Sequence, residues 1–220
     1  MQAQGQGELD LAIDLPLRRI DDTKVRGRYQ FANNTLQVVE GLPPITDVHG
    51  TLDITEASVT AREINGRAFA GPVRVQVGSE AGKDGGKVLI KASGKADLGE
   101  VGRHFAWPLL DRVSGAAQWK SDIIIQKRRA YVLVTSDLLG AVSPWPEPLK
   151  KTADSTLPLR IERSEPVAGQ ENYRITLGKV MSGLLVRRDG RWANGIINVG
   201  GAGGAPPASG LGVRIALPRI

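Results

Sequence analysis

The sequence predicts an all-β fold in which antiparallel hairpins lie side by side in an elongated curled sheet or sandwich-like groove, with one or two short helices. Two patterns predict it. Apolar and polar residues alternate along several segments, which is the period of a strand with one apolar face. Turn residues separate these segments at short intervals. Aromatic residues make up only 5% of the 220 residues, so the core must consist mainly of Val, Ile and Leu.

The alternating segments predict strands with one dry and one solvated side. They cover residues 9–17, 73–77 and 173–177, whereas residues 131–135 are apolar at both kinds of position and are expected to be buried on both faces. The residues that carry the pattern are Leu9, Leu11, Ile13, Leu15 and Leu17, then Val73, Val75 and Val77, then Tyr131, Val132, Leu133 and Val134, and finally Tyr173, Ile175 and Leu177.

Three turn signals connect predicted strands. Asn33-Asn34 predicts a compact hairpin between residues 29–31 and 36–38, and residues 83–86, Lys-Asp-Gly-Gly, link the strand at 73–77 to one at 88–92. Asp189-Gly190 suits a type I′ hairpin turn between residues 184–188 and 191–199, because both central residues of that turn need a positive φ. A weak repeat of residues 27–38 at residues 50–61 predicts that the first half is built from hairpins.

Helix is expected in two places only. Asp97 to Phe105 fits a short helix with Asp97 as N-cap and Glu100 three residues on, and Pro108 would stop it. A second turn or two is expected from Pro146 to Thr152. Residues 200–212, rich in Gly and Pro, predict a loop before a last strand over 211–217. These elements divide into a first β-hairpin region at residues 1–113, which ends in the short helix, and a second β-sheet region at 114–220, continuous with the first.

The charge of +6 and the sequence pI of about 9.8 raise the question of nucleic acid. The basic residues are scattered, and the densest cluster is only Lys127, Arg128 and Arg129. No aromatic or helical nucleic-acid motif accompanies them, so no nucleic-acid partner is expected. A solvated basic face, or weak attraction to anionic lipid headgroups, accounts for the charge.

Catalytic patterns are weak. His49 and His104 lie far apart, and the chain has no Cys, which excludes a thiolate metal site. Ser121-Asp122 and Ser136-Asp137 lack the Gly-x-Ser-x-Gly turn of a hydrolase nucleophile. The glycines of residues 200–204 lack the Lys-Ser/Thr ending of a phosphate loop. We therefore expect a non-enzymatic protein with no catalytic residue, metal or cofactor.

The four Trp residues could pack in the core, stack on sugars or lie at the level of lipid headgroups. Their spacing is irregular, which favours core or hairpin packing for most of them. Trp145, held between Pro144 and Pro146, is the best candidate for an exposed aromatic residue.

Several stretches resemble the AsmA-like envelope proteins of Gram-negative bacteria, especially the YhdP type. The resemblance rests on turn and strand signatures and covers about residues 40 to 160. The stretches are residues 42–52 (LPPITDVHGTL) with 70–73 (AGPV), 114–119 (SGAAQW), and 136–140 (SDLLG) with 146–151 (PEPLKK) and 157–159 (LPL); the hairpin at 189–195 (DGRWANG) is also similar.

The resemblance implies an internal periplasmic piece of a protein that one N-terminal helix anchors in the inner membrane. Such proteins extend across the periplasm as a long curled sheet whose apolar face is thought to conduct phospholipid acyl chains to the outer membrane. In this chain no apolar run approaches the ~18 residues of a membrane span, so the anchor is expected to lie outside it. The expected partners are phospholipid or another acyl-chain lipid and neighbouring segments of the full-length protein.

The alternation also allows a closed β-sandwich, a structural interaction module of the cell envelope without lipid binding. If the groove is open, its lining belongs to the alternating strands of the first half, and the patch it leaves exposed is unusually large. The candidate lining residues are Tyr29, Phe31, Leu52, Ile54, Val73, Val75 and Val77.

Overall fold

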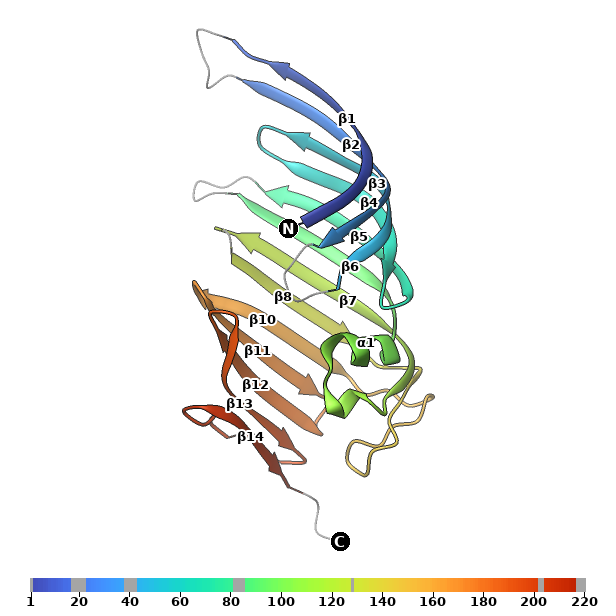
Figure 1. The fold of residues 1–220 in the computed structure, drawn as a ribbon, viewed down its shortest axis with the longest axis vertical. Helices are drawn as coiled ribbons and strands as arrows, with labels where there is room; N and C mark the ends of the chain where they lie inside the picture. Colours follow the sequence, from blue (N-terminus) through green and yellow to red (C-terminus); the bar gives the residue numbers. More distant parts are fainter. Residues whose placement is uncertain are drawn as a thin grey trace. The chain divides into compact units, whose positions relative to one another are not determined.

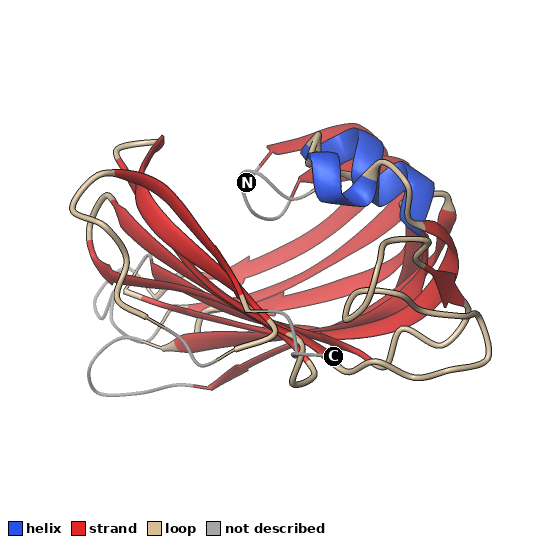
Figure 2. Ribbon diagram, turned by 90° about the horizontal axis from the view of Figure 1, so that it is seen from below, coloured by secondary structure: helices blue, strands red, loops and turns tan. Residues whose placement is uncertain are grey.

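The computed structural model describes residues 2–16, 23–37, 43–80, 86–127, 129–201 and 204–216. Most of these residues lie in strands (Figure 2), and α1 (Leu98–Phe105) is the one α-helix among them. No helix within these ranges has the length and hydrophobicity to cross a membrane. Some residues on which the sequence analysis relied lie outside the described ranges, namely Leu17, Val38, Leu42, Lys83, Asp84, Gly85, Arg128 and Leu217.

Fourteen strands in the described residues form a single open, mixed sheet, so the predicted all-β class with few helices is confirmed. The strands are β1 (Gln2–Asp14), β2 (Lys24–Gln37), β3 (Ile45–Thr55), β4 (Val59–Ala68), β5 (Gly71–Glu80), β6 (Lys87–Asp97), β7 (Ser114–Gln126), β8 (Arg129–Ser136), β9 (Ala141–Val142), β10 (Leu159–Val167), β11 (Gln170–Leu177), β12 (Met181–Arg188), β13 (Arg191–Val199) and β14 (Gly210–Ile215).

The chain divides into two compact units. The first unit contains residues 1–95 and 124–127, and the second contains residues 96–123 and 128–220. The predicted division between residues 113 and 114 stays a prediction.

In the first unit each strand from β1 to β6 pairs antiparallel with the next one along the chain (Figure 1). This is the arrangement of neighbouring hairpins that the sequence predicted, and the alternating segments 9–14 and 73–77 lie in β1 and β5. The described strands of this unit form one layer, so no second sheet of the unit covers either face.

A band of β-bulges crosses β1, β2 and β3. The pairing register shifts between Gln4 and Gln6 on β1 and at Asn34 on β2, and Gly5 and Asn33 have positive φ values of 126° and 59°. Bulges bend strands and increase their twist. In Figure 1 the long strands of this unit bend along their length.

The hairpin predicted at Asn33-Asn34 is therefore wrong, because both residues lie inside β2, which keeps its pairing with β1 and β3 on either side. The first copy of the predicted repeat is for the same reason one strand and not a hairpin. Asn tolerates the left-handed conformation that both a turn and a bulge require. The dipeptide alone therefore did not distinguish the two.

The buried side chain of Asn34 holds this bulge. Its Oδ1 accepts a hydrogen bond from the backbone N–H of Ala32 at 2.8 Å, and its Nδ2 lies 3.5 Å from the hydroxyl of Tyr29. Asn34 also lies against Gly5 of β1, where an added Cβ would come within 2.8 Å of the Asn34 Nδ2 atom. The bulges of neighbouring strands are thus packed on one another.

In the second unit the strand order is β7-β8-β10-β11-β12-β13-β14, with β9 paired to β7. The turn between β12 and β13 has positive φ at both Asp189 (47°) and Gly190 (78°), as predicted. The last pair differs from the predicted side-by-side hairpins, because β14 runs parallel to β13. β14 starts beside Asn194, near the beginning of β13, as a parallel neighbour requires.

Helix α1 begins where the sequence predicted it. The Asp97 side chain accepts a hydrogen bond from the Glu100 N–H at 3.0 Å, and the chain leaves the helix through Ala106 in the left-handed conformation. Pro108 opens a short 3-10 helix, η2 (Pro108–Leu110). The helical turns predicted over residues 146–152 are wrong: a single turn closed by Leu149 N–H on the Pro146 carbonyl occupies this segment.

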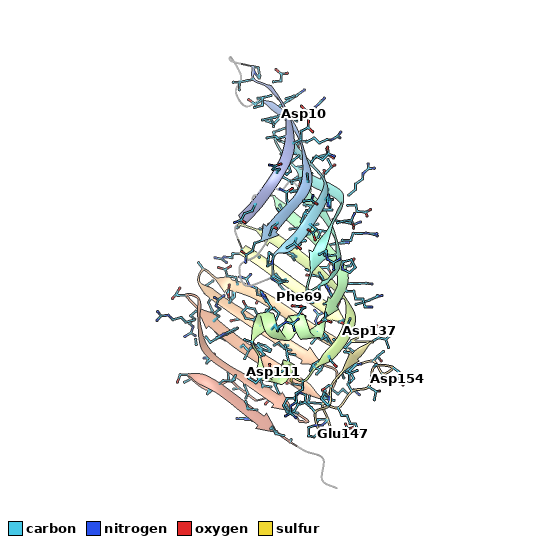
Figure 3. All side chains as sticks on the ribbon, turned by 45° about the vertical axis from the view of Figure 1, so that its right-hand side comes forward. Asp10, Phe69, Asp111, Asp137, Glu147 and Asp154 are labelled. Carbon is cyan, nitrogen blue, oxygen red and sulfur yellow. The ribbon has the colours of Figure 1, made fainter. Side chains whose placement is uncertain are left out.

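The connection between β8 and β10 contains β9, and Figure 3 shows Asp137, Glu147 and Asp154 along it. Lys151 is buried and donates hydrogen bonds from its Nζ to the carbonyls of Ala141 and Thr152, both at 2.9 Å. Burial lowers the pKa of Lys151, and the nearby carboxylates of Asp154 and Asp137 oppose this shift. Lys151 thus joins two parts of this connection, the segment at Ala141 and the segment at Thr152, by hydrogen bonds.

Replacing Asn34 with Ala is expected to lower the free energy of unfolding by about 1–3 kcal/mol, because the buried amide that accepts from the Ala32 N–H would be lost and its space left unfilled. Urea unfolding followed by circular dichroism measures the change. Asn65→Ala, an exposed substitution on β4, is the control and is expected to cost less than about 0.5 kcal/mol. Equal stabilities for the two variants would show that Asn34 does not hold the bulge.

Candidate functional site

The register of the first unit shows which side chains share a face, because directly opposed residues of antiparallel strands project to the same side of the sheet. Tyr29 lies opposite Leu52, and Ile54 lies opposite Gly27. Phe31 is two residues from Tyr29 on the same strand, and the two rings contact edge to face with centroids 4.8 Å apart. The four candidates on β2 and β3 therefore lie together.

The same face continues over β4, β5 and β6. Gly50 of β3 lies opposite Ile64, and Ile64 lies opposite Val75. Val73 and Val77 flank Val75 with the same orientation, since they are two residues away on the strand. The register thus brings all seven predicted lining residues onto one face, which we call the first apolar face.

The exposure of this face changes from one edge of the unit to the other. On β5, Val73 and Val75 are buried, with 3% and 6% of their surface exposed. Tyr29, Phe31, Leu52, Ile54 and Val77 are partly exposed. On β1, Leu9 is 55% and Ile13 is 59% exposed. The accessible part of the first apolar face therefore lies over β1, β2 and β3.

Leu9, Leu11 and Ile13 belong to this face, although they were not among the candidate lining residues. Leu9 lies opposite Tyr29, and Leu11 lies opposite Gly27. An added Cβ at Gly27 would come within 3.2 Å of the Leu11 side chain and 3.6 Å of the Ile54 side chain. The alternation on β1 was the available signal, but it did not show that these side chains continue the face of β2 and β3.

The opposite face of the first unit is polar. Exposed ion pairs link neighbouring strands across it, with Arg28 Nε 2.9 Å from Asp53 Oδ1 and Arg74 Nε 3.2 Å from Glu63 Oε1. Exposed pairs of this kind contribute little stability. They keep this side of the layer solvated, so the two faces of the first unit have opposite character.

The second unit has an apolar face of its own, on which register partners form rows across the strands. One row contains Val134, Ile161, Ile175, Gly183, Ile197 and Val213, and the next row towards the strand ends contains Ser136, Leu159, Leu177, Met181, Val199 and Ile215. We call these rows the second apolar face. Its outermost residues on β14, Val213 and Ile215, are exposed, as is Leu211 in the adjoining row, whereas Ile175 and Val199 further in are buried.

A group of charged side chains lies on the same side as the second apolar face. The sequence did not predict this group. Arg163 lies opposite Tyr173, and Glu171 lies opposite Arg187. One Glu171 oxygen accepts a hydrogen bond from Arg163 at 2.5 Å, and the other accepts one from the Tyr173 hydroxyl at 2.9 Å. Arg187 approaches that second oxygen at 3.3 Å. We call these four residues the arginine cluster.

Electrostatics in the arginine cluster keep the carboxylate ionised. Burial would raise the pKa of Glu171, but hydrogen bonds from Arg163 and Tyr173, together with the charges of Arg163 and Arg187, lower it overall. Burial, followed by the neighbouring Glu171 carboxylate, raises the pKa of Tyr173. The four side chains therefore form a charged, hydrogen-bonded group beside an apolar surface.

The two tryptophans most relevant to binding lie in different settings. Trp145 is half-buried, its indole N–H donates to the Leu109 carbonyl at 3.0 Å, and the Arg112 guanidinium lies 5.5 Å from its ring centroid. Trp192 is 58% exposed and contacts Tyr173 edge to face, with centroids 5.4 Å apart. Trp192, which lies opposite Arg187, is thus the exposed aromatic residue beside the arginine cluster.

Ser136 and Asp137, which were considered for catalysis, form hydrogen bonds with backbone groups around them. The Ser136 hydroxyl donates to the Gln118 carbonyl at 2.6 Å and accepts from the Leu138 N–H, while Asp137 Oδ1 accepts from the Leu139 N–H. His49 lies on the polar side of β3, opposite Ala32. No group of three or more side chains able to hold a metal ion occurs among the described residues.

Comparison with known families decides the relationship. A family model described as YhdP protein matches residues 1–220, the whole chain. The chain belongs to the YhdP family. The resemblance noted in the sequence is thereby confirmed, and membership indicates a bacterial envelope protein. Neither the curated proteins nor the solved structures contain a match to this member of the YhdP family.

Replacing Glu171 with Gln is expected to lower the free energy of unfolding by about 2 kcal/mol at pH 7, because the largely buried guanidinium groups of Arg163 and Arg187 would lose their counter-charge. The pKa of Glu171 is lower in the folded chain than in the unfolded chain, so its contribution is present at neutral pH and is lost as the pH falls through the folded-state value. Urea unfolding at several pH values measures the change.

The stability gap between wild type and Glu171→Gln should therefore shrink as the pH falls into the acidic range. Glu147→Gln, at an exposed position on the connection between β8 and β10, is the control and is expected to change stability by less than about 0.5 kcal/mol at any pH. A gap that stays constant from neutral to acidic pH would contradict the described role of Glu171.

Proposed function

We propose that the chain is a non-enzymatic segment of a periplasm-spanning, inner-membrane-anchored envelope protein, and that it binds or conducts phospholipid acyl chains between the inner and outer membranes. The observation that carries the proposal is the exposed part of the first apolar face. There Leu9, Leu11 and Ile13 continue the surface of Tyr29 and Leu52, and the described strands of the unit form no second sheet over them. Contiguous exposed apolar surface of this kind marks binding sites.

Acyl chains suit this surface for a physical reason. The side chains that β1 to β3 contribute to the first apolar face are aliphatic and aromatic, and the described ion pairs of the unit do not lie on this part of the face. Covering apolar surface gains roughly 25 cal/mol per Å², and this gain has no directional requirement. A row of hydrophobic side chains without polar partners can therefore hold a chain of methylene groups at many positions along it, which movement along the sheet requires.

A second function has its own observation. Among the strands that the structure describes, β1 and β14 each pair with only one other, and β14 exposes Leu211, Val213 and Ile215. Unpaired strand edges are sites for pairing with another chain or segment. These edges favour a structural interaction module of the cell envelope, which would contact neighbouring segments of the full-length protein and bind no lipid.

The substitution Leu11→Glu is expected to weaken binding of a fluorescent fatty acid about tenfold, because a charged side chain on the first apolar face would have to be desolvated. The matched control is Ala12→Glu on the polar side of the same strand, for which less than a twofold change is expected. Both positions are exposed, so circular dichroism should show that both variants keep the fold. Val75→Glu is less suitable, because Val75 is buried and its loss tests stability.

A wild-type chain that excludes the fatty acid probe would contradict lipid binding. If such a chain also associates with rising concentration in sedimentation experiments, the structural module is the better account. Equal losses for Leu11→Glu and Ala12→Glu would indicate a general charge effect and would remove the first apolar face as the binding surface.

A further inference from the structure

The arginine cluster occupies one end of the second apolar face. Arg163 and Tyr173 lie in the same row as Leu185, and Glu171 and Arg187 lie in the next row, beside the turns that join β10 to β11 and β12 to β13. In the opposite direction along the strands the two rows already described are apolar, apart from Ser136 and Gly183. The surface is therefore charged at the end beside these turns and apolar at the other end.

The dimensions of this surface suit a lipid. Arg187 and Met181 are six residues apart on β12, which corresponds to about 20 Å at ~3.3 Å per residue. One leaflet of a bilayer provides about 15 Å of hydrocarbon. The second apolar face is thus long enough for one extended acyl chain, with the arginine cluster at the position of its headgroup.

The charges of the cluster are not explained by stability alone. Its side chains retain little exposure, 13% for Arg163 and 19% for Glu171, and ion pairs that lose water in this way gain little over apolar side chains of the same size. Within the described part of the chain, the buried Nε of Arg163 has no hydrogen-bond partner. An unsatisfied buried donor costs free energy, so the cluster does not serve stability alone.

The cluster also carries more positive than negative charge. Two guanidinium groups share the Glu171 carboxylate, and Arg187, with 24% of its side chain exposed, contacts it only at 3.3 Å. The nearby Glu165 is used by the β10–β11 turn, where its Oε1 accepts a hydrogen bond from the Gly169 N–H at 3.4 Å. An anion with several oxygen acceptors is the complementary ligand, because a guanidinium offers donors in a planar fork.

Trp192 lies between the arginine cluster and the apolar strand surface. It is the register partner of Arg187, it contacts Tyr173, and more than half of its surface is exposed. Tryptophan is favoured where an apolar layer meets a polar one, because its ring is apolar and its N–H is polar. A cation, a charged network and an exposed indole thus adjoin an apolar strip.

We propose that the arginine cluster binds the phosphate of a phospholipid headgroup, with Arg187 as the main contact, while an acyl chain of the same molecule lies along the second apolar face. The inference rests on the proposed function, which it deepens by assigning a headgroup site. The phosphate enters beside Arg187 and Trp192, and the acyl chain runs from there along the exposed side chains of β14, Leu211, Val213 and Ile215.

The test compares lipids with and without the phosphate by isothermal titration calorimetry on the whole chain. The probes are monomeric dihexanoyl phosphatidylglycerol, dihexanoylglycerol and glycerol phosphate. For the wild type, the phosphatidylglycerol is expected to bind about tenfold more tightly than the dihexanoylglycerol. One hydrogen bond to a charged group contributes a free energy of this size. Glycerol phosphate alone should bind far more weakly than the intact lipid.

The deciding variant is Arg187→Gln, which should remove the preference for the phosphate-containing lipid and leave dihexanoylglycerol binding unchanged. The matched control is Arg174→Gln, on the opposite side of the same sheet. Arg174 is exposed, and its register partners on the neighbouring strands are Glu162 and Leu184. It should keep the full preference. If Arg187→Gln is less stable than the control, Arg187→Lys replaces it, with a loss of roughly threefold expected because the planar fork is gone.

The outcomes separate the two proposals. Equal binding of both lipids by the wild type, equal effects of the Arg187 and Arg174 substitutions, or glycerol phosphate binding as tight as that of the lipid would each overturn the headgroup site. The proposed function would survive the first two results, since acyl chains still bind. Failure of the wild type to bind either lipid would contradict the proposed function itself, and the headgroup site with it.

Discussion

The first apolar face is the constraint on which the other features depend. The described strands of the first unit form one layer, and a layer with a dry side gains stability only when that side is covered. Full burial of a Leu or Ile side chain contributes about 1.5–3 kcal/mol, a gain that the exposed side chains of β1 leave partly unused. Bulges around Asn34 bend the strands, and ion pairs solvate the other face. The remaining apolar surface is available to a ligand.

The parts of this arrangement that the sequence predicted are those with local causes. Alternation fixed which residues of β1 and β5 project together, Asp97 capped α1, and Asp189-Gly190 closed the turn of β12 and β13. Asn33-Asn34 was misassigned because its conformational preference serves a bulge as well as a turn. The parallel direction of β14 depends on the path of the preceding loop, for which the residues of the strand carry no signal.

The candidate site also combines features with local causes and features that depend on how the strands pair. The seven lining candidates share a face because their strands alternate and pair in register, although the sequence did not indicate that Val73 and Val75 are buried and Leu9 to Ile13 are exposed. The arginine cluster combines residues from three strands, and only the registers of β10, β11 and β12 bring Arg163, Glu171 and Arg187 together. Membership of the YhdP family indicates an envelope protein, and the two apolar faces support the proposal that the sheet is a surface for lipid.

The most direct measurement is the lipid content of the chain as purified from bacterial cells. Native mass spectrometry under gentle conditions should detect the chain with added masses that match phospholipids, and extraction followed by lipid analysis should recover the same molecules in proportion to the protein. A chain that is homogeneous at its bare mass, yields no lipid on extraction and acquires none when mixed with phospholipid would contradict the account.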